Sequence, residues 1–150
     1  SVMHHEMAAE DSVKISGYYK ILGNLERIGD HAMNILGYAA SMKKMGVVFS
    51  DKAKQEIVIM KSMSLQILED VAGDQITDIK TMLEKTSRDE QKIDDIRNEN
   101  LRQQMERIGK NECVADASIF FSELLTDFER IGDHALNIAE QYYEMLTRVV

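Results

Sequence analysis

The chain contains 150 residues, with no proline, a single cysteine and a formal net charge of −8. This length allows one compact domain, and the lack of proline and scarcity of glycine and aromatic residues favour helices over a β-sandwich or barrel. The negative charge argues against a nucleic-acid partner, because phosphate binding requires a surplus of lysine and arginine. We therefore expect an all-α protein that attracts cations.

The lone cysteine and the apolar runs indicate the compartment. Cys113 cannot form an internal disulfide, which fits a reducing compartment such as the cytoplasm. The N-terminus lacks the basic and apolar regions of a signal peptide, and no apolar run approaches the roughly 20 residues needed to cross a bilayer. We expect a soluble, cytoplasmic chain.

The first half of the chain has the apolar spacing of two helices. The first is predicted over about 11–44, and Gly46 ends it. Its seam alternates steps of four and three through Ile21, Leu25, Ile28, Ala32, Ile35, Ala39 and Met42. Ser50 is the predicted N-cap of the second helix. That helix should stop near Gly73 and bury Ile57, Met60, Ser64, Ile67 and Val71.

The second half predicts two more helices after a tight connection over 73–78. The third helix runs to about Gly109, with apolar positions at Ile79, Leu83, Ile93, Ile96, Leu101, Met105 and Ile108. This stripe fails between Leu83 and Ile93, where Thr86 is the only residue suited to a core. The last helix, about 115–147, continues as Leu124, Phe128, Ile131, Ala135, Ile138, Tyr142 and Met145. Four long helices with short turns predict an antiparallel four-helix bundle.

An internal repeat links the first helix to the last. The stretch LERIGDHAMNI, residues 25–35, returns as FERIGDHALNI, residues 128–138, with nine of eleven positions identical at an offset of 103 (128 minus 25). Each copy should be the same element of a duplicated unit. We expect residues 50–147 to form a complete three-helix repeat, and residues 11–46 to be the last helix of a preceding, truncated repeat.

Three helices each carry a row of acid, acid and amide at a spacing of four, which places each row along one side of its helix. The rows are Glu26, Asp30, Asn34; Glu90, Asp94, Asn98; and Glu129, Asp133, Asn137. Neighbouring carboxylates repel each other, and a bound cation would turn that repulsion into coordination. Oxygen ligands suit Mg, Mn, Ca or Fe better than zinc or copper. The alternative is a solvated polar face with ion pairs to arginines.

The repeated stretch also holds a glycine and a histidine. Gly29 and Gly132 lie in mid-helix, where glycine costs about 1 kcal/mol relative to alanine, so close helix approach is expected there, with or without a metal. His31 and His134 point about 100° away from the preceding aspartates. We expect these histidines either to contact the metal-binding carboxylates without binding the metal themselves or to make hydrogen bonds in the core. The Glu-x-x-His pattern of ferritin-like di-iron sites is missing from both stretches.

The repeated stretches LERIGDHAMNI and FERIGDHALNIAE resemble the signature helix of the PhoU family of phosphate-uptake regulators. The segment EQKIDDIR, residues 90–97, also resembles the second helix of that family's repeat. The proline-free segment 109–134 is most similar to the C-terminal, cytoplasmic PhoU-like domain of bacterial sodium/phosphate cotransporters. Gln104 departs from the histidine expected in many such transporters.

The resemblance implies metal binding by E-x-x-x-D pairs on adjacent helices. It assigns this role to Glu90 and Asp94 with Glu129 and Asp133, and it makes Glu26 and Asp30 half of a site whose partner helix is absent from this chain. Because the first helix lacks its own repeat, it should expose an apolar side and associate, most simply as a two-fold homodimer.

The leading hypothesis is a non-enzymatic, metal-binding regulatory domain of a sodium-dependent phosphate cotransporter. Its expected partner is the membrane-spanning part of the transporter or a phosphate-signalling protein, and the parent protein would be anchored in the inner membrane. One alternative is a free-standing regulator of phosphate signalling. Others are a di-metal carboxylate oxidase and a purely structural bundle.

Overall fold

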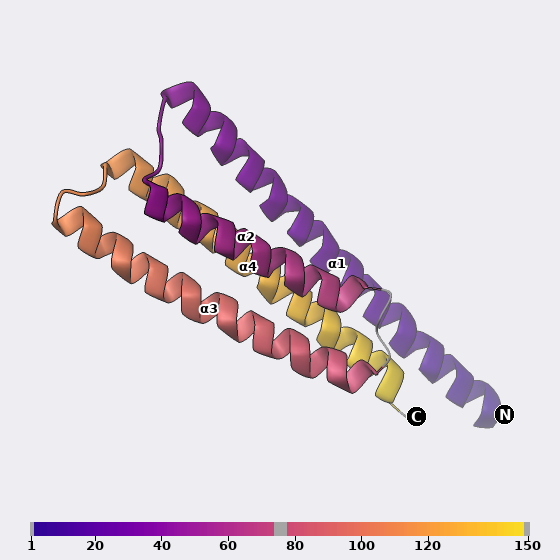
Figure 1. Cartoon of the computed structure of the whole chain (residues 1–150). Coiled ribbons are helices and arrows are strands. Elements are labelled where there is room, and N and C mark those ends of the chain that lie inside the picture. Colours follow the sequence, from indigo (N-terminus) through magenta and orange to yellow (C-terminus); the bar gives the residue numbers. More distant parts are fainter. Residues whose placement is uncertain (1, 74–77, 149–150) are drawn as a thin grey trace.

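The structure, a computed structural model, describes residues 2–73 and 78–148, with side chains from residue 8 onward. Its helices are α1 (Val2–Met45), α2 (Asp51–Ala72), α3 (Ile79–Gly109) and α4 (Ala115–Thr147), with no strand among the described residues. Consecutive helices run antiparallel, and α1 lies at an angle beside the group formed by α2, α3 and α4 (Figure 1). The predicted all-α antiparallel four-helix bundle is confirmed.

Local hydrogen bonds set the ends of the helices. Ser50 caps α2 as predicted, because its hydroxyl accepts a hydrogen bond from a first-turn backbone N–H at 3.2 Å. Asp78 caps α3 in the same way at 3.1 Å. Gly46 follows the end of α1 with φ at +69°, a left-handed conformation that suits glycine. The predicted connection over 73–78 falls largely on residues 74–77, outside the described residues.

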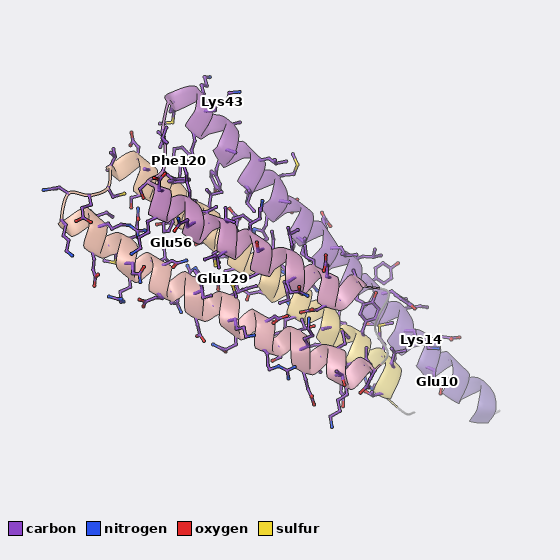
Figure 2. The ribbon with its side chains drawn as sticks, in the orientation of Figure 1. Glu10, Lys14, Lys43, Glu56, Phe120 and Glu129 are labelled. Atoms are coloured by element: carbon purple, nitrogen blue, oxygen red, sulfur yellow. The ribbon has the colours of Figure 1, made fainter. Side chains whose placement is uncertain are left out.

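The helix α1 is longer than its apolar pattern predicted. It begins at Val2 and not near Asp11. The added stretch contains no glycine or proline and includes the helix formers Ala8, Ala9 and Glu10. This end of α1 projects beyond the other helices, and Glu10 lies on the projecting part (Figures 1 and 2). Local propensity, and not core packing, explains the extension.

The helix α4 organises the packing of the other three. Among the described residues, α1 contacts only α4, whereas α2 and α3 contact α4 and each other. A helix covered on several sides must be apolar around most of its circumference. The predicted series on α4 is accordingly confirmed, since Leu124, Phe128, Ile131, Ala135 and Ile138 are each 6% exposed or less.

The predicted seam of α1 is half wrong. Leu25, Ala32 and Ala39 face solvent, although they continue the heptad series. The face that packs on α4 consists of Gly17, Ile21, Asn24, Ile28, His31, Ile35, Tyr38 and Met42. The prediction was wrong because α1 has two adjacent apolar stripes. Among the described residues, α4 covers only the stripe that also contains the polar residues Asn24 and His31.

The C-terminal half of α3 buries polar residues where apolar ones were predicted. Met105 and Ile108 are exposed, whereas Gln104 is buried and Arg107 is partly buried. Arg107 donates hydrogen bonds to Glu56 on α2 at 2.7 Å and to Gln104 at 2.6 Å. These hydrogen bonds help polar side chains to replace apolar ones inside the bundle, although Glu56 Oε2 is buried without a partner among the described residues.

The two repeated glycines have different surroundings. A Cβ atom at Gly132 would lie 3.1 Å from Cδ1 of Ile93, so α3 approaches α4 closely there. A Cβ atom at Gly29 would meet nothing within 4 Å. The expected close helix approach is confirmed at Gly132 and wrong at Gly29, because no described residue covers that face of α1.

Gly29→Ala and Gly132→Ala form a matched pair, since both change the glycine of an RIGDHA segment. We expect Gly29→Ala to raise the free energy of unfolding by about 0.5–1 kcal/mol through helix propensity. Gly132→Ala must also displace the fully buried Ile93, so it should be less stable than Gly29→Ala by about 1–2 kcal/mol. Urea unfolding of dilute protein, followed by circular dichroism, measures both. Equal changes would contradict the close packing of α3 on α4.

Candidate metal centre

Three carboxylates meet where α3 packs against α4. Glu90 and Asp94 lie one turn apart on α3, and Asp133 faces them from α4. Each residue contributes one oxygen, and these oxygens lie within 4.8 Å of one another. All three residues are half-buried. Gly132, which directly precedes Asp133, permits the close helix approach that brings these groups together.

The electrostatics of this cluster fit a cation. Burial, followed by the carboxylates of Asp94 and Asp133, raises the pKa of Glu90 from 4.5 to about 8. Asp94 Oδ1 is buried without a hydrogen-bond partner among the described residues. A hard cation would partner this oxygen and relieve the repulsion, and carboxylate oxygens are the ligands that such cations prefer. The residues present therefore fit a metal ion.

The fourth predicted carboxylate lies beside this cluster and pairs with an arginine. Arg97 Nε is 2.9 Å from Glu129 Oε2, and Glu129 is not among the three groups within mutual reach. Burial raises the pKa of Glu129, and Arg97 opposes this shift. Glu129 lies in the middle part of the bundle, away from its ends (Figure 2). The predicted set of four is thus arranged as three plus one.

The three asparagines of the repeated rows are directed elsewhere. Asn98 is exposed, and its oxygen accepts a hydrogen bond from the adjacent arginine at 3.2 Å. Asn34 donates to Asp127 Oδ1 at 3.3 Å, and Asn137 donates to Asn24 Oδ1 at 3.2 Å. The last two bonds join α1 to α4. The structure therefore does not bring these amides to the three clustered carboxylates.

The two histidines form a symmetric pair between α1 and α4. His31 Nδ1 lies 2.8 Å from Asp127 Oδ1, and His134 Nδ1 lies 3.0 Å from Asn24 Oδ1. Their rings stack with centroids 5.4 Å apart. Positions 24 and 31 precede 127 and 134 by the offset of the repeat, so α1 and α4 meet with approximate two-fold symmetry. The prediction that these histidines make hydrogen bonds in the bundle is confirmed.

The first copy of the acidic row has no partner row in the described chain. Glu26 and Asp30 are exposed on α1, and α1 contacts only α4 among the described helices. Neither residue belongs to a described group of three or more potential metal ligands. The two copies of the motif are therefore in unequal environments.

A second acidic pair, between α2 and α3, was missed by the sequence reasoning. The side chain of Asp70 is 1% exposed and accepts a hydrogen bond from Lys85, which also lies 3.7 Å from Asp89. Burial, with the contact to Asp70, raises the pKa of Asp89. The two aspartates lie on different helices, so no spacing pattern in the sequence predicts that they form a pair. The lysine already supplies its counter-ion.

The raised pKa of Glu90 predicts that rising pH destabilises metal-free protein. A carboxyl with a pKa near 4.5 in the unfolded chain and about 8 in the fold binds more protons when folded, so stability falls as pH rises through this window. In chelator, we expect the Tm to fall from about pH 5 to pH 8 and Glu90→Gln to flatten the fall.

Scanning calorimetry at a series of pH values measures this effect. Glu84→Gln, on the exposed side of the same helix, is the control and should keep the wild-type slope. If the Tm of Glu90→Gln fell with pH as steeply as that of wild type, the raised pKa of Glu90 would not be the cause of the fall.

Comparisons with known proteins give a family and no individual relative. No curated protein and no solved structure gave a significant match. None of the described helices is long and apolar enough to span a membrane. The PhoU domain matches residues 1–39 and 57–142, which are 125 residues (39 plus 86) of the 150. From residue 2 onward the first segment lies in α1, and the second extends from α2 to α4. The chain therefore belongs to the PhoU domain family.

Proposed function

We propose that this chain is a regulatory domain for phosphate transport that responds to a cation bound by Glu90, Asp94 and Asp133. Membership of the PhoU family supports the link to phosphate transport. The clustering of three carboxylates at the contact of α3 and α4 is the observation that carries the cation. The proposed activity is binding and regulation, without catalysis.

The donor chemistry limits the choice of cation. Carboxylate oxygens without thiolate or imidazole favour Mg, Mn, Ca or Fe. Glu129 is the proposed fourth ligand, because burial and the carboxylates of Asp133 and Asp94 raise its pKa while Arg97 opposes the shift. An oxidase is a weaker candidate. The two repeated histidines make their hydrogen bonds between α1 and α4 and do not belong to the cluster of Glu90, Asp94 and Asp133.

The proposed setting is the cytoplasmic, C-terminal domain of a sodium-dependent phosphate cotransporter in the inner membrane. The proline-free segment 109–134 supports this setting. A free-standing phosphate-signalling regulator is the alternative, and the family match is equally consistent with it. The full coding sequence distinguishes them, since a hydrophobic half upstream of this domain supports the transporter and its absence supports the free-standing regulator.

We also propose a homodimer formed through α1. The solvent-facing stripe of α1, as used below, consists of Ile15, Tyr18, Leu22, Leu25, Met33 and Leu36, each at least 50% exposed. The equivalents of Tyr18, Leu22 and Leu25 one repeat later are Phe121, Leu125 and Phe128, all buried. The steps from Ile15 to Leu25 are three and four, which suits a coiled-coil seam, and the step of eight from Leu25 to Met33 has Gly29 at its middle. A two-fold contact between two copies would cover both stripes.

Binding of Mn²⁺ tests the cation site. We expect Asp94→Asn and Asp133→Asn each to lower the Mn²⁺ affinity by about tenfold or more, equivalent to at least about 1.4 kcal/mol. Asp30→Asn is the matched control, because it changes the same aspartate in the other copy of the motif, and its affinity should stay within about twofold. Isothermal titration calorimetry, with elemental analysis of the purified protein, provides the measurement.

The same variants connect the site to function. Phosphate uptake by cells should change with Asp133→Asn and stay unchanged with Asp30→Asn. If wild-type protein binds no Mn²⁺, Mg²⁺, Ca²⁺ or iron, the cation proposal fails. If binding is lost in Asp133→Asn while uptake is unaffected, the cation is structural and its regulatory role is excluded.

The dimer is tested by the mass of the protein in solution. We expect wild type to have the mass of two chains in light scattering after gel filtration, and Leu22→Glu to have the mass of one, because a charge in the stripe cannot be buried. Ile119→Glu is the control, since Ile119 is 62% exposed on α4, outside the stripe. A wild-type mass of one chain would contradict the dimer.

A further inference from the structure

Arg97 connects α3 to α4 at one end of the acidic cluster. Its Nε lies 2.9 Å from Glu129 Oε2, and a second nitrogen donates to Thr126 Oγ1 at 3.2 Å. A third nitrogen donates to Asn98 at 3.2 Å. The arginine side chain is 25% exposed and that of Glu129 is 20% exposed. The guanidinium is therefore held by two hydrogen bonds and by an ion pair with Glu129 that is not a hydrogen bond, and it is largely shielded from solvent.

The positions of these residues create one continuous strip of charge. On α3, Arg97 follows Asp94 by one turn, and on α4, Glu129 precedes Asp133 by one turn. The strip therefore holds three clustered carboxylates, then Glu129, then a cationic side chain. Asp94 Oδ1 has no hydrogen-bond partner among the described residues, while the guanidinium of Arg97 forms an ion pair with Glu129. Arg97 therefore neutralises the fourth carboxylate, Glu129, and the other three carboxylates have no counter-ion among the described residues.

We propose that Arg97 is a built-in counter-ion that competes with a bound cation for Glu129 and thereby weakens cation binding. This inference rests on the proposed cation site at Glu90, Asp94 and Asp133. The three carboxylates can bind a cation while Arg97 keeps Glu129. Full use of Glu129 as a fourth ligand requires breaking the ion pair. Arg97 is thus a positioning residue that sets the cation concentration at which the site fills.

Arginine is chemically suited to this role. Its guanidinium stays protonated at every physiological pH, so it can compete with a cation whenever Glu129 is ionised. Two of its nitrogens donate to Thr126 and Asn98 while the charged group stays beside Glu129, an arrangement that the single ammonium group of lysine reproduces less well. Partial burial strengthens the interaction relative to an exposed ion pair. A site restrained in this way would fill over a higher range of cation concentration, as a sensor requires.

The test compares Mn²⁺ binding in wild type, Arg97→Gln and Arg97→Lys. We expect Arg97→Gln to bind Mn²⁺ about tenfold more tightly, because it removes a unit charge beside the site and frees Glu129. Arg97→Lys keeps the charge and should lie between the two. Arg102→Gln is the control, since Arg102 pairs with Glu99 and Glu106 on the exposed side of the same helix. Circular dichroism confirms that each variant is folded.

A double-mutant cycle identifies Glu129 as the group through which Arg97 acts. In a Glu129→Gln background, Arg97→Gln should lose most of its gain in Mn²⁺ affinity, because no carboxylate is left to be freed. A general repulsion between the guanidinium and Mn²⁺ would instead give the same gain in both backgrounds, which would overturn the inference. The electron paramagnetic resonance spectrum of bound Mn²⁺ should change between wild type and Arg97→Gln and be the same with or without Arg97 in the Glu129→Gln background.

The remaining outcomes separate this inference from the proposed function. If wild type binds Mn²⁺ and Arg97→Gln binds it equally or more weakly, the cation site stands and the competition is wrong. If neither protein binds Mn²⁺, both are wrong. A gain that is present in wild type, absent in Glu129→Gln and reduced in Arg97→Lys supports both.

Discussion

The close contact of α3 with α4 at Gly132 is the constraint on which the rest of the site depends. The absence of a side chain there lets Ile93 pack 3.1 Å from the position of a Cβ atom, and the next residue, Asp133, then faces Glu90 and Asp94. The same packing holds one carboxylate in protonated form near neutral pH, as the raised pKa of Glu90 indicates. Apolar contacts elsewhere in the bundle thus hold together groups that repel one another, and a cation or a proton would relieve the repulsion.

The two copies of the repeated motif are alike in one contact and different in the other. Between α1 and α4 the two copies form a symmetric polar contact. The histidine of each copy forms a hydrogen bond with the residue just before the other copy, His31 with Asp127 and His134 with Asn24. Away from that seam, α4 is covered by α2 and α3, whereas the corresponding face of α1 is open among the described residues. One motif therefore contributes to a cluster of carboxylates, and the other presents an acidic row and an apolar stripe to solvent.

The charge balance at the α3–α4 contact supports the proposal of a cation site there. Three carboxylates lie together without a described counter-ion, and the fourth is neutralised by Arg97. The neighbouring contact of α2 with α3 shows the other arrangement, in which Lys85 pairs with the buried Asp70 and the half-buried Asp89. A lysine neutralises such a pair under all conditions, whereas the neutralisation of the three clustered carboxylates depends on protons or cations from the solution. This difference explains why we place cation binding at one contact and not at the other.

Local spacing and capping chemistry are enough to predict the four helices, the helix boundaries at Gly46 and Ser50, the repeat and the acidic rows. It also indicated the PhoU family, which the comparison confirmed. Three features could not be predicted in this way and became visible in the folded chain. They are the stripe of α1 that packs on α4, the burial of Gln104 and Arg107 in place of Met105 and Ile108, and the pairing of Glu129 with Arg97 beside the cluster. Helical spacing shows which residues share a face of one helix. Which faces meet depends on contacts between residues far apart in the chain, and local pattern does not encode those contacts.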